Sequence, residues 1–209
     1  MRQDKETRSK LLQSAREEFM EKGYMKASLR NICRNAGVTT GALYFFFEDK
    51  EDLFTSLTKE TVNNIYQIMQ KHFQNESEML GNGQLFTPVS GEEDGDFEVS
   101  KMIIHQMYLH REEVLLILTK SQGSGLENIA DKFVETVEKH YMAMAKGMQA
   151  AHPDKVLDDK FIHWLAHEQI DAFIYMITHI EDEETAVNYF RQVITYMTSG
   201  WYGLFYAGE

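Results

Sequence analysis

Two short helical segments around a glycine turn constrain the fold of this chain more than any other feature of its sequence. Ser28 is a natural N-cap for the first segment, Leu29–Asn35, because its hydroxyl can accept a hydrogen bond from the first turn. Gly37 follows and supplies a tight turn, to which glycine is suited because it has no side chain. The threonines at 39–40 offer a cap for the second segment, Gly41–Phe47. The pattern predicts two short helices joined by a turn of fixed geometry.

A longer amphipathic segment, residues 5–22, precedes this pair. Its apolar residues recur at three- and four-residue steps, and Gly23 ends it as a helix C-cap. A supporting helix followed by two short helices is the helix-turn-helix plan, in which the second short helix enters the major groove of DNA. In that plan Thr39, Thr40 and Tyr44 carry polar groups toward the groove. An ordinary three-helix bundle with a tight turn remains the alternative on pattern alone.

The charge of the chain is divided unevenly between its two parts. The whole chain has a net charge of −12, which is unusual for a protein that binds a polyanion. Residues 1–50 nevertheless carry ten Lys and Arg against seven Asp and Glu, a net of +3, and the rest carries a net of −15. The sequence therefore predicts that only the N-terminal part approaches a polyanion, while the acidic remainder repels it.

The chain around the two short helices resembles the tetracycline-repressor (TetR) family of regulators. Upstream, Ala15, Phe19 and Gly23-Tyr24 fit the family pattern, and Phe46 departs from it because the family often places His there. The matching signature reads Ser28-Leu29-Arg30-Asn31-Ile32 and then Ala36-Gly37-Val38-Thr39-Thr40-Gly41-Ala42-Leu43-Tyr44-Phe45-Phe46-Phe47-Glu48-Asp49-Lys50-Glu51-Asp52-Leu53. The resemblance implies an all-α fold: an N-terminal three-helix helix-turn-helix DNA-binding head and a C-terminal helical effector-binding and dimerisation body.

The same resemblance implies which residues meet DNA. Thr39 and Thr40 would lie at the start of the recognition helix, and Tyr44 would hydrogen-bond a phosphate. Lys50 would meet the backbone from the next helix, and Ser28 would set its helix N-terminus against a phosphate, which the helix dipole favours. The partner would be double-stranded operator DNA with palindromic symmetry, bound by a homodimer. The predicted DNA-binding set is Ser28, Arg30, Thr39, Thr40, Gly41, Tyr44 and Lys50.

A long helix after the head sets the expected domain boundary. Helical periodicity extends over residues 49–75, so residues 1–50 are predicted as the DNA-binding domain and residues 51–209 as the effector-binding and dimerisation domain. Residues 80–96 break the periodicity with glycines, a proline and clustered acids. We expect an exposed acidic loop there, because the alternating ligands of a calcium-binding loop are missing.

Met, aromatic and His side chains are abundant in the C-terminal part. Such side chains form adaptable apolar walls, which predicts a pocket for a small hydrophobic effector. Plain helix core explains the same composition. A lipophilic cation, a fatty acyl group, a phenolic compound and a bile-acid-like molecule all fit it. The predicted ligand-binding residues are Met102, His105, Tyr108, Phe133, Tyr141, Met144, Trp164, His167 and Phe173.

The last two helices, expected at residues 158–180 and 183–207, each carry a broad apolar stripe. The stripe is wider than packing within a small body requires, and in the family the corresponding helices pair with a second copy. Packing within one chain is the alternative. The predicted dimer-interface residues are Phe161, Trp164, Ile170, Ile174, Phe190, Val193, Met197 and Trp201.

Other functional classes find less support in the sequence. His163 and His167 have a metal-chelating spacing, but no cysteine cluster accompanies them, so no metal and no cofactor are expected. No nucleophile–His–acid order or phosphate loop occurs, so we do not expect an enzyme. An enzyme or a helical adaptor that uses the body cavity without binding DNA remains the alternative. The single cysteine, Cys33, and the lack of a long apolar run predict a cytoplasmic protein without membrane contact.

Overall fold

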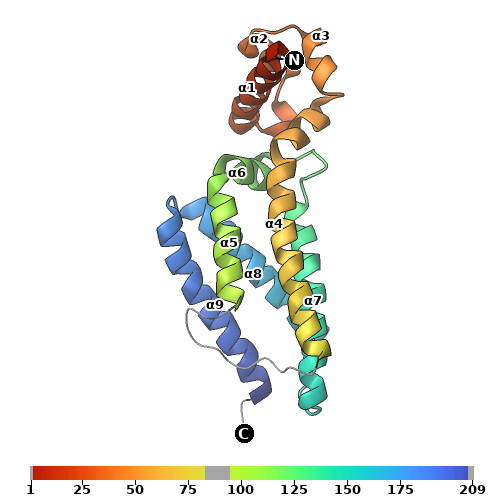
Figure 1. Ribbon diagram of the computed structural model, residues 1–209, viewed down its shortest axis with the longest axis vertical. Helices are drawn as coiled ribbons and strands as arrows, with labels where there is room; N and C mark the ends of the chain where they lie inside the picture. Colours follow the sequence, from red (N-terminus) through yellow and green to blue (C-terminus); the bar gives the residue numbers. More distant parts are fainter. Residues whose placement is uncertain (1, 83–94, 207–209) are drawn as a thin grey trace. The chain divides into compact units, whose positions relative to one another are not determined.

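The computed structural model describes residues 2–82 and 95–206, and all regular structure in these ranges is helical (Figure 1). The all-α prediction is therefore confirmed. The helices are α1 (Arg2–Lys26), α2 (Leu29–Ala36), α3 (Thr40–Phe46), α4 (Lys50–Gly81), α5 (Gly95–Leu109), α6 (Arg111–Lys120), α7 (Ile129–Ala151), α8 (Asp159–His179) and α9 (Glu183–Tyr206). Most of the predicted acidic loop, residues 83–94, lies outside the described residues, and its last two positions begin α5.

The helices belong to two compact units. Unit 1 comprises Met1–Asn63 and His110–Ile129, and unit 2 comprises Asn64–Leu109 and Ala130–Glu209. The long helix α4 contributes residues to both. The expected boundary at residue 50 coincides with the start of α4, whereas the compact N-terminal unit continues past it and includes α6.

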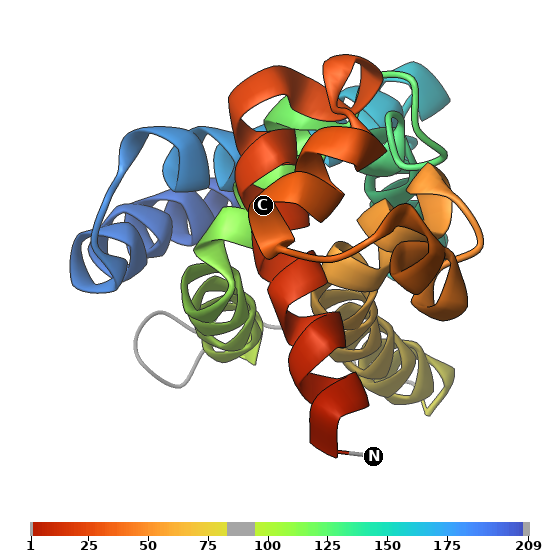
Figure 2. The same cartoon turned by 90° about the horizontal axis from the view of Figure 1, so that it is seen from above.

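In unit 1, α1 packs against α2, α3 and α6 (Figure 2). The core contains Leu11, Phe19 and Ile32, none of which is exposed, together with Leu116 from α6. Phe19 and Phe54 meet edge to face with ring centroids 5.0 Å apart, an arrangement that aromatic pairs prefer. The three N-terminal helices therefore share one core with the first turns of α4 and with α6.

Polar contacts also hold the segment 110–129 in unit 1. The guanidinium of Arg16 on α1 lies 3.3 Å from Glu112 and 2.7 Å from Glu113 on α6. Further along, the Gly125 N–H donates to the Glu51 carboxylate at 3.0 Å. Sequence periodicity could not reveal these contacts, because the partners lie far apart in the chain.

The local signals read from the sequence occur at the expected positions. Gly23 interrupts α1 with a φ of 72° and a ψ of 163°, a positive-φ conformation that glycine adopts readily, although α1 resumes after this kink and runs to Lys26. Gly37 ends α2 with a φ of 69°, and its N–H bonds back to the last turn. Ser28 and Thr39 are the N-caps of α2 and α3. The predicted helix-turn-helix geometry is thus confirmed at the level of the backbone.

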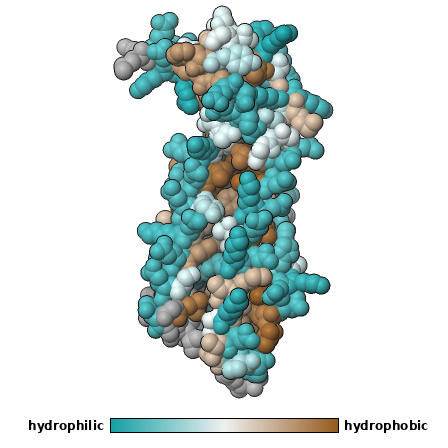
Figure 3. All heavy atoms as spheres, turned by 90° about the vertical axis from the view of Figure 1, so that its right-hand side faces the viewer, coloured by the Kyte–Doolittle hydropathy of each residue, from teal (hydrophilic) through white to brown (hydrophobic). Residues whose placement is uncertain are grey.

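Unit 2 is built from the rest of α4 with α5, α7, α8 and α9. Helix α9 packs against both α5 and α8. One core cluster joins α7, α8 and α9 through Met148, Ile162 and Phe205. In Figure 3, hydrophilic side chains cover most of the face in view, and apolar side chains gather in patches between them. Within the described ranges, no helix is long and apolar enough to cross a membrane.

Replacement of Leu116 tests whether α6 belongs to the core of unit 1. Leu116 is fully buried, so Leu116→Ala should lower the free energy of unfolding by about 2–5 kcal/mol, through lost burial and the cavity it leaves. The measurement is equilibrium unfolding in denaturant, followed by circular dichroism. Leu109→Ala is the matched control, because Leu109 is 62% exposed and should change stability by less than about 0.5 kcal/mol. Equal effects of the two replacements would contradict this packing.

Candidate nucleic-acid interface

The N-terminus of α2 is fixed by its cap and by a buried carboxylate. The Ser28 hydroxyl accepts a hydrogen bond from the Asn31 N–H, although at 3.5 Å this bond is long. The Ser28 N–H itself donates to Glu18 Oε1 on α1 at 3.1 Å. Glu18 thus holds the start of α2 against α1.

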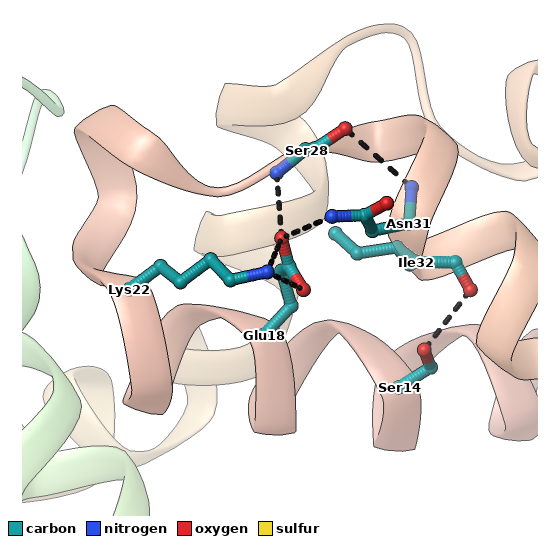
Figure 4. A network of polar contacts seen from close by, with 6 residues as sticks. All are labelled: Ser14, Glu18, Lys22, Ser28, Asn31 and Ile32. Carbon is teal, nitrogen blue, oxygen red and sulfur yellow. Dashed lines mark hydrogen bonds and ion pairs between the residues drawn. The ribbon is translucent and has the colours of Figure 1, made fainter.

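Glu18 is the centre of the polar network in Figure 4. Its side chain is almost fully buried, and besides Ser28 it accepts hydrogen bonds from Lys22 at 3.1 Å and from Asn31 Nδ2 at 3.3 Å. Near it, the buried Ser14 hydroxyl donates to the Ile32 carbonyl at 2.9 Å. A buried carboxylate is tolerated when it is paired and hydrogen-bonded, and Glu18 meets both conditions.

The ionisation of Glu18 reflects this network. Burial alone would raise the pKa of Glu18, since it penalises the charged form. The hydrogen bonds from Ser28, Lys22 and Asn31 outweigh burial, so the pKa of Glu18 is lowered from its ordinary value. The carboxylate is therefore ionised at neutral pH and is part of the frame that positions α2.

Helix α3 has one buried face and one exposed face. Leu43 is fully buried and Phe47, just beyond the helix, is 2% exposed; both anchor α3 to the core of unit 1. Thr39 caps the helix by accepting a hydrogen bond from the Ala42 N–H at 3.2 Å. The exposed face carries the predicted residues Thr40, Gly41 and Tyr44. The structure therefore brings these three together on one accessible surface.

The exposed surface of α3 also includes Phe45, which is not among the predicted DNA-binding residues. Phe45 is 76% exposed, more than Tyr44 at 58%, and its ring meets Phe46 edge to face at 4.9 Å. The signal that could have found it is the buried pair Leu43 and Phe47, because their four-residue spacing directs the two positions after Leu43 outward. An exposed apolar ring suits contact with a thymine methyl or a sugar face.

Lys50, which is predicted to meet the DNA backbone, has partners within its own chain. Its ammonium donates to the Met25 carbonyl at 3.2 Å and lies 4.7 Å from the centre of the Tyr24 ring. Burial lowers the pKa of Lys50, and the negative charge of Glu18 opposes part of that shift. Lys50 thus ties the start of α4 to the end of α1, while Arg30 is exposed on the first turn of α2.

The residues predicted to line an effector pocket lie in different environments of unit 2. Met102 is 55% exposed and Trp164 is 47% exposed, so both side chains face the surface of the chain. Tyr141 instead stacks on Trp201, with ring centroids 5.5 Å apart, and Met144 is buried in the same cluster. Tyr141 and Met144 are therefore grouped in the interior.

Two other predicted pocket residues fasten α5 to the connection between α8 and α9. His105 Nδ1 lies 3.0 Å from Glu183 Oε1, and the Tyr108 hydroxyl donates to the Ile180 carbonyl at 2.9 Å. Ile180 is the C-cap that follows α8, and Glu183 begins α9. Both side chains thus have structural partners within unit 2.

Residues predicted for a dimer interface divide into buried and accessible sets. Ile170, Phe190 and Trp201 are buried within their own chain, so they offer almost no surface to a second copy. Phe190 contacts the half-buried Phe173, another predicted pocket residue, with ring centroids 4.0 Å apart. Tyr196, which was not predicted, is 74% exposed on α9. The predicted residues that retain accessible surface are Phe161, Trp164, Ile174, Val193 and Met197.

The histidine pair noted in the sequence lies on one face of α8. The rings of His163 and His167 meet edge to face at 4.7 Å, and His163 Nδ1 lies 3.1 Å from Glu138 on α7. The predicted pocket residue Phe133 is half-buried, with its ring 6.3 Å from that of Tyr66. In the described part of the chain, the residues that could surround one metal ion lie elsewhere, on α4 and α5.

An accessible α3 surface carried on the α1–α2 frame defines a helix-turn-helix protein. Residues 11–57 match the family described as "Bacterial regulatory proteins, tetR family". The chain is 48% identical to the HTH-type transcriptional repressor BepR of Brucella suis biovar 1 over an alignment of 52 residues. This alignment covers 25% of this chain and 25% of BepR. The chain is also 42% identical to the HTH-type transcriptional regulator AcrR of Shigella flexneri over an alignment of 60 residues. This alignment covers 29% of this chain and 28% of AcrR. These matches span little more than a quarter of each relative.

Solved structures share the fold over almost the whole chain. A transcriptional regulator from Aquifex aeolicus VF5 aligns with a TM-score of 0.57 and 21% identity, over 91% of this chain and 99% of that one. A TetR family transcriptional regulator from Chloroflexus aurantiacus J-10-FL aligns with a TM-score of 0.57 and 15% identity, over 94% and 93%. At these identities the likeness shows the fold, in which a helix-turn-helix segment precedes a helical body.

Replacement of Glu18 by Gln tests the frame beneath the exposed helix. Glu18→Gln keeps the shape of the side chain but removes its charge from the hydrogen bonds with its three partners, so unfolding should become easier by about 1–3 kcal/mol at pH 7. The pKa of Glu18 is lower in the folded chain than in the unfolded chain, where it is near 4.5. The stabilisation is therefore complete when the pH is above the unfolded pKa, and it is lost as the pH falls through the folded pKa. Denaturant unfolding of both proteins from pH 7 to pH 3 should show the difference shrinking at the acidic end.

Glu17→Gln is the matched control for this replacement. Glu17 is exposed and accepts a hydrogen bond from Gln13. Its replacement should leave the stability within about 0.5 kcal/mol of the original protein at every pH. If Glu18→Gln behaved in the same way, the carboxylate would not be part of the frame.

Proposed function

We propose that this protein is a DNA-binding transcriptional repressor that acts as a homodimer on a palindromic operator and is released by a small hydrophobic effector. The observation that carries the proposal is the exposed surface of α3, formed by Thr40, Gly41, Tyr44 and Phe45. It lies within the segment that matches a family of bacterial regulatory proteins, and the similar BepR is named a transcriptional repressor.

Electrostatics support DNA as the partner of this surface. Residues 1–50 carry a net charge of +3, whereas the rest of the chain carries −15. Attraction to phosphates supplies most non-specific affinity for DNA, and base contacts then specify the sequence. In the proposed complex, the N-terminus of α3 and the Tyr44 hydroxyl contact phosphates, while Thr40 and Phe45 meet base edges.

Release by an effector follows from differential binding. An effector that binds the operator-free conformation more tightly must weaken DNA affinity by the same factor. Helix α4 has residues in both compact units, so we propose that it transmits the change. The interior residues Tyr141 and Met144 are the predicted pocket residues best suited to contact an apolar effector. The proposal includes no catalytic step.

The proposed homodimer uses the accessible sides of α8 and α9. Trp164 and Tyr175 on α8 are about half exposed, and Tyr196 on α9 is 74% exposed. Exposed large aromatic side chains on neighbouring helices suit an interface, where such residues provide much of the binding energy. A twofold dimer would present two copies of α3 to a palindrome.

Removal of the Tyr44 hydroxyl tests the DNA contact. Duplexes selected from a random pool by the wild-type protein serve as the probe, and binding is followed by fluorescence anisotropy at several salt concentrations. A hydrogen bond to a charged phosphate contributes about 1.5–3 kcal/mol, so Tyr44→Phe should weaken binding by about tenfold or more. Tyr66→Phe, which alters an exposed tyrosine of unit 2, should bind as the original protein does. Failure of the wild-type protein to select any duplex would contradict the assignment.

A charge placed at Trp164 tests the dimer. Sedimentation equilibrium should give a dimer for the wild-type protein and a monomer for Trp164→Glu, because an unpaired charge in an apolar interface is costly. Met102→Glu is the matched control, since Met102 is similarly exposed on α5. A wild-type monomer at micromolar concentration, or a Trp164→Glu variant that remains dimeric, would contradict this interface.

A further inference from the structure

Unit 2 contains a cluster of imidazoles and carboxylates that the proposed DNA-binding function does not use. His72 and Glu76 lie one turn apart on α4, Asp96 lies in the first turn of α5, and His140 lies on α7. Glu76 and His140 are each 7% exposed. Three helices therefore bring four ionisable side chains into a largely buried place.

The donor atoms of three of these residues converge. His72 Nε2 lies 2.9 Å from Asp96 Oδ1 and 3.3 Å from Glu76 Oε2. One ligand atom from each of the three residues lies within 4.8 Å of the other two. His140 Nε2 is 2.8 Å from the same Glu76 oxygen and so contacts the group from its buried side.

Each carboxylate has one imidazole hydrogen-bond partner, His72 for Asp96 and His140 for Glu76, and the 3.3 Å approach of His72 Nε2 to Glu76 Oε2 is an additional close contact. An imidazole nitrogen carries at most one hydrogen, so His72 Nε2 cannot make well-directed hydrogen bonds to both carboxylates. If that nitrogen instead presents its lone pair, one imidazole and two carboxylate oxygens surround a common point. A divalent cation at that point would neutralise the buried carboxylate of Glu76 and the partly exposed carboxylate of Asp96.

We propose that His72, Glu76 and Asp96 bind a divalent first-row transition-metal ion in unit 2. Imidazole suits Zn²⁺, Fe²⁺ and Ni²⁺, and carboxylates suit harder ions, so the mixed set selects a transition ion over Mg²⁺ or Ca²⁺. With bonds of about 2.0–2.2 Å, neighbouring ligand atoms lie about 3.3–3.6 Å apart. The 2.9 Å contact therefore opens by a few tenths of an ångström, and any separation near the 4.8 Å limit closes by about an ångström. Water fills the remaining coordination positions.

His140 is a positioning residue in this proposal. Its Nε2–H donates to Glu76 and orients the carboxylate toward the ion, as outer partners of metal ligands commonly do. Phe73 stacks on the His140 ring, with centroids 3.9 Å apart and planes 8° apart, and so fixes its orientation. The ligand set is thus held by a second layer of packed side chains.

The three proposed ligands lie in anionic surroundings that are partly accessible to solvent. Burial and then the charges of Asp96 and Glu76 raise the pKa of the neighbouring Tyr141. The Asp96 side chain is 40% exposed and that of His72 is 16% exposed, which gives an ion a route from solvent. The bound ion would join α4 to α5, two segments that only the fold brings together.

Metal titration of the full-length protein after chelator treatment tests the site. Zn²⁺ is measured by competition with a chromophoric chelator, and Co²⁺ by its visible d–d absorption. We expect one tight equivalent per chain and a Co²⁺ spectrum of nitrogen and oxygen ligands. Asp96→Asn and His72→Gln should abolish this equivalent. His140→Gln should keep one equivalent but weaken it about 10–100-fold, as expected for an outer partner.

Controls separate loss of a ligand from loss of the fold. His163→Gln removes a histidine that also contacts a glutamate, and it should bind metal as the original protein does. Circular dichroism without metal should be unchanged for Asp96→Asn, because that side chain is partly exposed. The proposal is overturned if the folded wild-type protein binds no equivalent of either ion, or if Asp96→Asn and His72→Gln bind as His163→Gln does. These measurements use no DNA, so their outcome is independent of the proposed repressor function.

Discussion

The N-terminal unit depends on the buried carboxylate of Glu18, which joins its first two helices. It accepts hydrogen bonds from Ser28, Lys22 and Asn31, and so holds the first turn of α2 against α1. Helix α3 packs on both α1 and α2. The position of its exposed surface therefore depends on a fixed angle between these two helices. The network is charge-assisted, so its hydrogen bonds are stronger than neutral ones.

The helical period separates the residues of α3 that anchor it in the core from those that face outward. Leu43 and Phe47 are buried in the core, and Tyr44 and Phe45 between them face outward. Lys50 strengthens the same construction, because its bond to the Met25 carbonyl ties α4 to the end of α1. A rigid scaffold that presents a few polar and aromatic groups is what recognition of a DNA groove requires, since each flexible side chain would lose entropy on binding.

Unit 2 combines apolar packing with an unexpected polar cluster. Its interior joins α7, α8 and α9 through large apolar side chains, whereas His72, Glu76 and Asp96 gather between α4 and α5. Such a cluster is expensive to bury unless its charges are compensated. The divalent cation proposed above would compensate the two carboxylates of this cluster.

The sequence alone determined the local structure of the N-terminal segment, including the break at Gly23, the caps at Ser28 and Thr39 and the exposed position of Tyr44. These features depend on backbone preferences and helical period, which act within a few residues. Only the tertiary structure decided which apolar faces are covered: it placed Leu116 in the N-terminal core and buried Phe190, Ile170 and Trp201 inside their own chain. It also brought Asp96 to His72. Periodicity reveals that a helix has an apolar face, but the partner of that face is set by packing between segments distant in sequence.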